Sequence, residues 1–182
     1  RLSPTRAEHV REDLDGRIEL ILDGGPTPVG VESTVLDMTT DPPMLLRPGG
    51  VTLEQLRDCL GEVAVLKGDD LEAAGRSPGL RYRHYAPRAQ VLIVERGAGE
   101  AAAAPWLAAG RPVALMAQRP VSLDHPGLLV RAMPGDLEAY ARDLFAVFRE
   151  LDSTGVEGIF VEAVPPEGVG LTIMDRRRRA AS

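Results

Sequence analysis

The chain has a single cysteine, Cys59, a single lysine, Lys67, and few aromatic residues. One cysteine cannot form a disulfide within the chain, which excludes a disulfide-rich secreted scaffold and fits a reducing compartment. Three scattered histidines and one cysteine show none of the spacings that zinc sites use. No apolar run is long enough to span a membrane, and no signal-peptide pattern is visible. We therefore expect a cytoplasmic protein without membrane contact.

The charge balance is acidic, with a formal net charge of -6 over 182 residues. This net charge argues against a protein whose entire surface binds nucleic acid, although it is compatible with a local basic patch. The length fits one large domain or two small ones. Neither a nucleophile elbow nor a catalytic triad is recognisable from residue spacing, so catalytic side chains stay unassigned.

The first third of the chain predicts two helices with short strands between them. Ser3 suits an N-cap and Pro4 the first helical position, so we expect a helix over residues 4–14. Thr52 is expected to cap a second helix over residues 52–60. Strand patterns cover residues 18–23, 31–38, 44–46 and 62–66. The first of these strands is mostly apolar and is expected to be buried.

The second half of the chain alternates between apolar strands and helices. The strand patterns cover residues 91–95, 113–117, 128–132 and 159–162. The helical patterns cover residues 98–109, 136–151 and 169–180, and the middle one repeats apolar residues at clear helical spacing. Such alternation predicts a small, mostly parallel, Rossmann-like three-layer α/β/α domain.

Residues 77–87, which read SPGLRYRHYAP, separate these two regions. The prolines favour an extended backbone, in which successive side chains alternate between two faces. This alternation divides five side chains between the faces: Arg81, Arg83 and Tyr85 opposite Tyr82 and His84. Two guanidiniums beside an aromatic ring suit a phosphorylated, planar ligand. An ordered linker whose tyrosines pack on a neighbouring surface is the alternative that composition favours.

Other patterns have both a ligand-binding and a structural interpretation. Gly97-x-Gly99-x-x-Ala102 follows a strand and opens a helix, as in a dinucleotide fingerprint. The acidic residue expected after the next strand is missing, however, and an alanine-rich run produces such spacing by chance. The four arginines at residues 176–179 suit either RNA contact or a solvated helix end that complements the helix dipole.

Two hydroxyl residues, Ser33 and Thr34, lie in a strand pattern that follows a glycine-containing loop. Arg47 ends another strand pattern just before a Pro-Gly turn. Side chains at strand ends and in adjoining loops are common ligand contacts, so these residues are candidates for a binding site. Hydroxyls within a strand can equally be ordinary ladder residues, and these residues alone leave both interpretations open.

Five segments carry a family resemblance over essentially the whole chain. They read SPTRAEHVREDLDGRI, ILDGGPTPVGVESTVLD, LLRPGGVT, SPGLRYRHYAP and YARDLFAVFRELDSTGVEGIFVEAVPPEGVGLTIMDR. In this order they resemble the threonylcarbamoyl-AMP synthase family of the Sua5 type. The resemblance implies the C-terminal part of a YrdC-like catalytic domain at residues 1–66 and a linker or lid at 67–88. It implies a Sua5-type C-terminal domain at 89–182.

The resemblance also implies an activity. Members of this family are nucleotidyltransferases that make L-threonylcarbamoyladenylate and pyrophosphate from L-threonine, bicarbonate and ATP. The product feeds the N6-threonylcarbamoyl modification of adenosine in tRNA, so tRNA-modification enzymes are expected as indirect partners. Mg²⁺ is expected to accompany ATP, although its protein ligands are not identifiable in this sequence.

The resemblance assigns roles to residues by their position in the motifs. Ser3, Arg47 and Tyr85 would contact ATP, and Ser33 would contact L-threonine. Four further residues are secondary candidates: Thr34, Arg81, Tyr82 and Arg83. Tyr82 competes with Tyr85 for the place over the nucleotide. A different class of function, a non-catalytic nucleotide- or RNA-binding regulatory module, is the alternative hypothesis.

One departure from the family yields a prediction about this chain alone. The family's basic nucleotide-binding residues and its Ser-x-Asn segment would stand upstream of Ser3, and the 182 residues do not contain them. We therefore expect no threonine-dependent release of pyrophosphate when the 182-residue chain is incubated with L-threonine, bicarbonate and ATP. A coupled pyrophosphate assay checks this, and release above the threonine-free background would contradict it.

Overall fold

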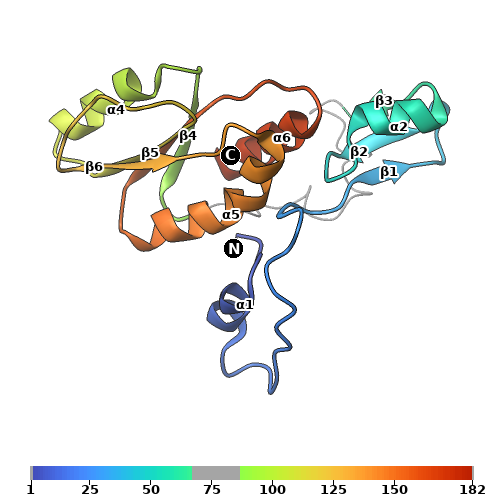
Figure 1. Cartoon of the computed structure of the whole chain (residues 1–182), viewed down its shortest axis with the longest axis horizontal. Coiled ribbons are helices and arrows are strands. Elements are labelled where there is room, and N and C mark those ends of the chain that lie inside the picture. The colour runs from blue at the N-terminus through green and yellow to red at the C-terminus, as the bar shows by residue number, and fades with distance from the viewer. Residues whose placement is uncertain (1, 67–86, 182) are drawn as a thin grey trace.

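The computed structural model of the chain describes residues 2–66 and 87–181. Figure 1 shows two separate sheets with helix α6 (Val169–Ala181) between them. The predicted linker residues lie outside the described residues: Arg81, Tyr82, Arg83 and Tyr85. The linker predicted over residues 67–88 lies outside the described residues up to residue 86, and the predicted domain boundaries stay a prediction.

The smaller sheet has three short strands. Strand β1 (Val35–Asp37) pairs antiparallel with β2 (Met44–Arg47), and β2 pairs parallel with β3 (Ala64–Val65). The strand predicted over residues 31–38 is thus shortened to its second half, because residues 31–34 leave the ladder and lie against the loop after β2. The strands predicted over residues 44–46 and 62–66 are confirmed as β2 and β3.

Helix α2 (Leu53–Leu60) begins where the sequence predicts it. Thr52 Oγ1 accepts a hydrogen bond from the Gln55 N–H at 3.3 Å. In return, Gln55 Oε1 accepts one from the Thr52 N–H at 2.9 Å. This reciprocal pair is a capping box, which satisfies two backbone donors that the first turn of a helix leaves unpaired.

The first helix starts later than predicted. Helix α1 covers Ala7–Leu14 with Arg6 at the N-cap, so Ser3 is not a cap and Pro4 is not the first helical residue. The Ser3 hydroxyl instead donates to the Glu32 carboxylate, far away in the sequence. A backbone N–H near the helix start is satisfied by the His9 side chain, whose Nδ1 accepts from the Thr5 N–H at 3.0 Å. Tertiary and local side-chain bonds therefore replace the predicted cap.

The buried strand predicted over residues 18–23 is wrong. These residues form no strand, and Ile18, Leu20 and Leu22 are 40%, 72% and 87% exposed. A β-strand is stabilised by hydrogen bonds to a neighbouring strand. Within the described residues, no strand pairs with this segment. The apolar pattern alone could not reveal that.

The larger sheet has four parallel strands, which confirms the prediction of a mostly parallel sheet. Their bounds are β4 (Gln90–Val94), β5 (Val113–Ala117), β6 (Leu128–Ala132) and β7 (Gly158–Glu162). The strand order is β4-β7-β5-β6. Helices connect β4 to β5 and β6 to β7, whereas a loop without a helix connects β5 to β6. Among the described residues, no helix combines the length and the apolar character that crossing a bilayer requires.

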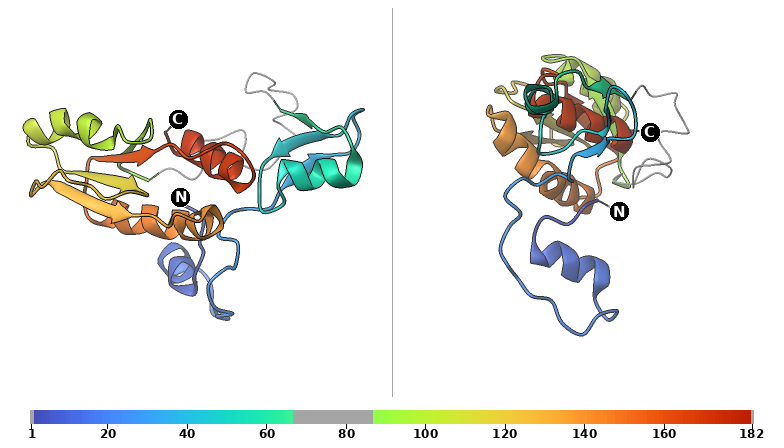
Figure 2. Two further views of the ribbon diagram at one scale, coloured as in Figure 1. Left: turned by 45° about the horizontal axis from the view of Figure 1, so that its top comes forward. Right: turned by 90° about the vertical axis from the view of Figure 1, so that its right-hand side faces the viewer.

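Three helices cover the two faces of this sheet: α4 (Gly99–Ala108), α5 (Leu137–Ser153) and α6 (Val169–Ala181). Side chains of β5 alternate between the faces. Leu115 packs with Ala103 and Leu107 of α4, whereas Met116 packs with Phe145 of α5. Figure 2 shows α4 and α5 on opposite sides of the sheet, and Ile173 and Met174 of α6 belong to the same buried cluster as Phe145 of α5. The result is a three-layer arrangement.

Helix α6 corrects the interpretation of the arginine run. Both interpretations of residues 176–179 required exposed guanidiniums, but Arg176 and Arg177 are each 0% exposed. Arg178 is exposed, and Arg179 donates to Asp175 at 2.8 and 2.9 Å. Because two of the four arginines are buried and bonded within the protein, the interpretation of this run as an RNA contact loses its main support.

The capping box gives a prediction about stability. Replacing Thr52 by Ala removes the oxygen that accepts the Gln55 N–H, so we expect the free energy of unfolding to fall by about 1 kcal/mol. Thr52→Ser keeps the oxygen and serves as the control, with a loss well below that of Thr52→Ala. Urea unfolding followed by circular dichroism measures both, and equal losses in the two variants would contradict the capping explanation.

Candidate functional site

Arg47 and Ser33, predicted to bind two different substrates, are hydrogen-bonded to each other. Arg47 Nε donates to the Ser33 carbonyl oxygen at 3.1 Å, and one terminal nitrogen donates to Ser33 Oγ at 3.2 Å. Arg47 is only 7% exposed, whereas Ser33 is exposed. Because the Ser33 hydroxyl accepts this bond, its own O–H can still donate to a ligand. The pair thus presents a donor and a positive charge together.

Thr34 makes a different kind of contact. Its Oγ1 donates to the Val51 carbonyl at 2.7 Å and accepts from the Val51 N–H at 3.0 Å. The hydroxyl therefore satisfies both polar groups of one backbone residue, as a partner strand would. This fastens the segment that contains Ser33 to the loop after β2. The geometry favours a positioning role for Thr34 over direct ligand contact.

The same two segments touch through Gly49. A Cβ atom at this position would lie 2.2 Å from the Thr34 nitrogen and 2.4 Å from the Ser33 carbonyl carbon. Real Cβ contacts are never that short, and both neighbours are backbone atoms that cannot rotate away. Glycine is therefore required, because it lets the loop after Arg47 approach the backbone of Ser33 and Thr34 directly.

Ser3 joins this group through Glu32. Its hydroxyl donates to one carboxylate oxygen of Glu32, the residue just before Ser33. The structure therefore brings together Ser3, Ser33, Thr34 and Arg47, the four predicted site residues that lie within the described parts of the chain. Their assignment to ATP or L-threonine stays a prediction.

Sequence reasoning missed three residues that support this group: Glu32, Thr172 and Arg176. Arg176 Nε donates to Glu32 Oε2 at 2.5 Å, and another nitrogen donates to the Pro48 carbonyl at 2.9 Å. Thr172 Oγ1 donates to the Gly49 carbonyl at 2.9 Å. Thr172 and Arg176 are four residues apart and so lie on one face of α6. That spacing was visible in the sequence, but the run of arginines suggested an exposed helix end.

At the predicted dinucleotide fingerprint, the place where a phosphate would bind is filled by a side chain of the protein. At the start of α4, the Gly99 N–H donates to Glu162 Oε1 at 3.2 Å, and Arg119 donates to the same oxygen at 3.0 Å. A second nitrogen of Arg119 donates to Glu100 Oε1 at 2.8 Å. The bonds from Arg119 and Ser122 lower the pKa of Glu100 to about 2. The Glu162 carboxylate thus lies at the helix start, where a phosphate would bind, and this argues against a dinucleotide site there.

No metal centre was found in the described part of the chain. Within residues 2–66 and 87–181, no three or more His, Cys, Asp or Glu side chains form a group that could hold a metal ion. The expectation of Mg²⁺ therefore rests on ATP chemistry alone, in which phosphate oxygens and water supply most of the ligands.

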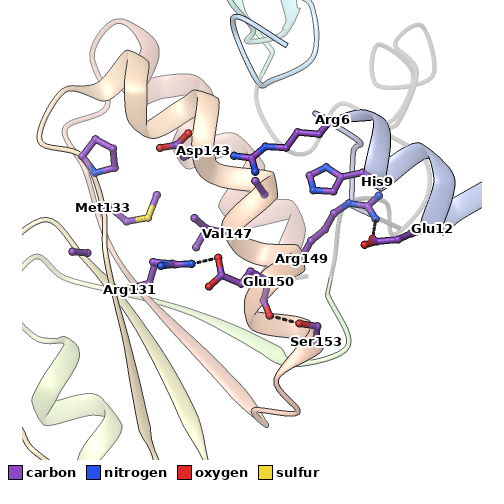
Figure 3. Close-up of a pocket in the computed structure, with 13 residues that line it drawn as sticks. Arg6, His9, Glu12, Arg131, Met133, Asp143, Val147, Arg149, Glu150 and Ser153 are labelled. Carbon is purple, nitrogen blue, oxygen red and sulfur yellow. Dashed lines mark hydrogen bonds and ion pairs between the residues drawn. The ribbon is translucent and has the colours of Figure 1, made fainter. Parts of the chain in front are cut away.

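A cavity of about 560 Å³ lies between α1, α5 and the loop after β6, and Figure 3 shows its lining. Its charged groups largely pair with one another or with nearby residues. Arg131 pairs with Glu150, and Arg149 donates to Asp13 at 2.5 Å. None of the four clustered site residues lines it. The cavity lies between the N-terminal segment and α5 and is therefore distinct from the candidate site.

His9 on the wall of this cavity gives a prediction about pH. Burial, and secondly the charge of Arg149, lower the pKa of His9 below its usual value of about 6.5. Between the lowered pKa and about 6.5, the unfolded chain binds more protons than the folded one. The contribution of His9 is therefore fully present above pH 6.5 and is lost as the pH falls through the lowered pKa.

Urea unfolding at pH 7.5 and pH 5.5 tests this prediction. His9→Asn keeps an acceptor near the Thr5 N–H but does not titrate, so we expect its free energy of unfolding to fall less on acidification than that of the original chain. Carboxylates titrate equally in both proteins and cancel in the comparison. The same fall in both proteins would refute the role of His9.

Two family models match this chain, and the boundary between them falls within the smaller sheet, between β2 and β3. The family model described as "Threonylcarbamoyl-AMP synthase, C-terminal domain" matches residues 51–182, and the model described as "Telomere recombination" matches residues 1–49. The first match covers well over half of the chain. The boundary between the two models falls at the loop after Arg47, next to the candidate site.

Individual relatives agree with these family models. Threonylcarbamoyl-AMP synthase of Pyrococcus abyssi is 42% identical over 98% of this chain and 54% of that protein. The enzyme of the same name from Bacillus subtilis is 42% identical over 98% of this chain and 53% of that protein. The crystal structure of P. abyssi Sua5 complexed with L-threonine matches 99% of this chain and 54% of that chain, with a TM-score of 0.87 and 40% identity.

The chain spans about half the length of the curated relatives it matches. The match to the C-terminal-domain model runs from residue 51 to residue 182, after the match that ends at residue 49. The chain therefore belongs to the Sua5-type threonylcarbamoyl-AMP synthase family, of which it holds the end of the YrdC domain and the C-terminal domain.

Proposed function

We propose that this chain supplies part of the substrate site of an L-threonylcarbamoyladenylate synthase. The complete enzyme would make threonylcarbamoyl-AMP and pyrophosphate from L-threonine, bicarbonate and ATP, for N6-threonylcarbamoyladenosine formation in tRNA. In this proposal residues 1–66 end a YrdC-like domain, residues 67–88 form a lid, and residues 89–182 form a Rossmann-like accessory domain. The family membership and the clustering of the candidate residues support it.

The Ser33–Arg47 pair is the observation that carries the proposal. Ser33 is exposed and can donate a hydrogen bond. A terminal nitrogen of the Arg47 guanidinium lies 3.2 Å from Ser33 Oγ. L-threonine offers a carboxylate and a hydroxyl, and ATP offers phosphates, so both ligands match this combination of donor and positive charge. In the proposal Ser33 contacts L-threonine, Arg47 contacts ATP, and Ser3 contacts ATP from the side of Glu32.

The reaction needs positioning more than covalent catalysis by the protein. The amino group of L-threonine attacks bicarbonate to give a carbamate and water. A carboxylate oxygen of the carbamate then attacks the α-phosphorus, and the bond from that phosphorus to pyrophosphate breaks. Holding the two reactants together, neutralising the developing charge and excluding water from the labile carbamate are the expected contributions.

Buried Arg47 suits this role. It is held by the Ser33 carbonyl, so its position is set before a ligand binds, and an organised charge stabilises a transition state better than one that must reorient. Tyr85, with Tyr82 as the competing choice, and Arg81 and Arg83 would close over the nucleotide from the lid. Mg²⁺ would accompany ATP through its phosphates.

Substitution of Arg47 tests the proposal in a full-length synthase that carries these residues. Arg47→Ala removes a charged hydrogen-bond donor, so we expect ATP binding to weaken by ~1–3 kcal/mol. Ser33→Ala is expected to weaken L-threonine binding more than ATP binding, because it removes only the hydroxyl. Isothermal titration calorimetry with each ligand measures both effects.

The control is Arg178→Ala, which removes an arginine that is exposed on α6. It should leave both affinities unchanged. If Arg47→Ala binds ATP as tightly as the original enzyme, the assignment of Arg47 is wrong. If Ser33→Ala leaves L-threonine affinity intact, the threonine site lies elsewhere.

A further inference from the structure

The residues next to the Ser33–Arg47 pair are joined by one buried guanidinium. Arg176 of α6 is 0% exposed and bonds both to the Glu32 carboxylate and to the Pro48 carbonyl. Glu32 precedes Ser33 in the chain, and Pro48 follows Arg47. The two segments that carry the candidate site are therefore tied together by a side chain that belongs to neither of them.

The charge of Arg176 is compensated in place. Glu32 lies on one side, and Asp175 accepts from another nitrogen at 2.5 Å. A buried charge is stable only when it is paired and its donors are satisfied. Removing the guanidinium would take the charged partner away from the largely buried Glu32 carboxylate, which also accepts a hydrogen bond from the Ser3 hydroxyl. Loss of Arg176 would therefore change the geometry of the candidate site as well as the stability of the protein.

Thr172, one turn earlier on α6, supports the same loop. Its hydroxyl donates to the Gly49 carbonyl, and this contact is buried. Gly49 already lies against the backbone of Ser33 and Thr34 on its other side, with no room for a Cβ atom. The loop is therefore held between α6 and the Ser33 segment, and a shift of α6 would shift the loop with it.

Arg177, the next residue, extends in another direction. One nitrogen donates to the Glu162 carbonyl at 2.7 Å, another bonds to the Tyr140 hydroxyl, and the guanidinium lies 4.7 Å from the centre of the Tyr140 ring. These partners belong to the end of β7 and to α5. Consecutive arginines of α6 thus fasten the helix to the parallel sheet and to the candidate site.

We propose that Arg176 is a positioning residue for the substrate site: it holds Ser33 and Arg47 at their mutual distance without touching a substrate. Through it, the parallel-sheet domain sets the geometry of the site. This inference rests on the proposed function, because it requires Ser33 and Arg47 to contact the substrates.

The test uses a full-length synthase that carries these residues and compares Arg176→Met with Arg176→Lys. Met keeps the apolar stem but loses the charge and the donors, and Lys keeps the charge but cannot span both partners. We expect Arg176→Met to lower kcat/KM for both L-threonine and ATP by about 10- to 100-fold. Arg176→Lys should recover part of that loss, and exposed Arg178→Met should lose nothing.

A double-mutant cycle separates positioning from general destabilisation. If Arg176 acts through Arg47, the effect of Arg176→Met on ATP affinity should shrink when Arg47→Ala is already present. A purely structural role predicts the same loss in both backgrounds, which would overturn the inference. Unchanged affinity for both substrates in a folded Arg176→Met enzyme would overturn it as well.

Thr172→Val is the second variant, for the case that Arg176→Met does not fold. It removes one buried hydrogen bond with little change of shape, and we expect a several-fold loss of affinity for both substrates; unchanged affinity would overturn the inference. The two proposals fail differently. If Arg47→Ala and Ser33→Ala leave substrate binding unchanged, both fall. If those variants weaken binding and the Arg176 and Thr172 variants do not, only the present inference falls.

Discussion

The arrangement of this protein depends on one buried charge. Arg176 is removed from water completely, and burial of a guanidinium is costly unless its donors find acceptors. The acceptors are Glu32, Asp175 and the Pro48 carbonyl, which come from three parts of the chain. Satisfying this one side chain therefore fixes where α6 lies relative to the small sheet. The positions of Ser33 and Arg47 follow from that, since each is adjacent to a partner of Arg176.

Helix α6 consequently belongs to two structural units at once. Its apolar residues complete the face of the parallel sheet that α5 also covers, and Arg177 anchors it to Tyr140 and to the end of β7. Thr172 and Arg176, on another face of the helix, bond to the segments of the candidate site. The parallel sheet itself offers no comparable site at the start of α4, because Glu162 and Arg119 occupy the position that a phosphate would take. The candidate site thus lies at the junction of the two units.

Local patterns predicted most of the elements but not their surroundings. All four parallel strands and the helices after residue 88 match the predicted ranges to within two residues, because apolar periodicity and caps are encoded locally. The strand predicted over residues 18–23 was wrong for the opposite reason. Its apolar pattern is correct for a strand, but the described residues provide no neighbour to pair with it. Likewise, Ser3 had the right residue type for a helix cap, and a distant carboxylate took its hydroxyl instead.

The sequence by itself determined the family, because several motifs occur in the family's order, and it identified Ser3, Ser33, Thr34 and Arg47 as candidates. The tertiary structure alone decided how these residues meet and which other residues hold them. Arg176 and Glu32 are 144 positions apart, and no local pattern reports a contact over that distance. A run of four arginines has the same sequence whether it is solvated or buried. Only the carboxylate and carbonyl groups brought to it by folding turn two of those arginines into structural residues.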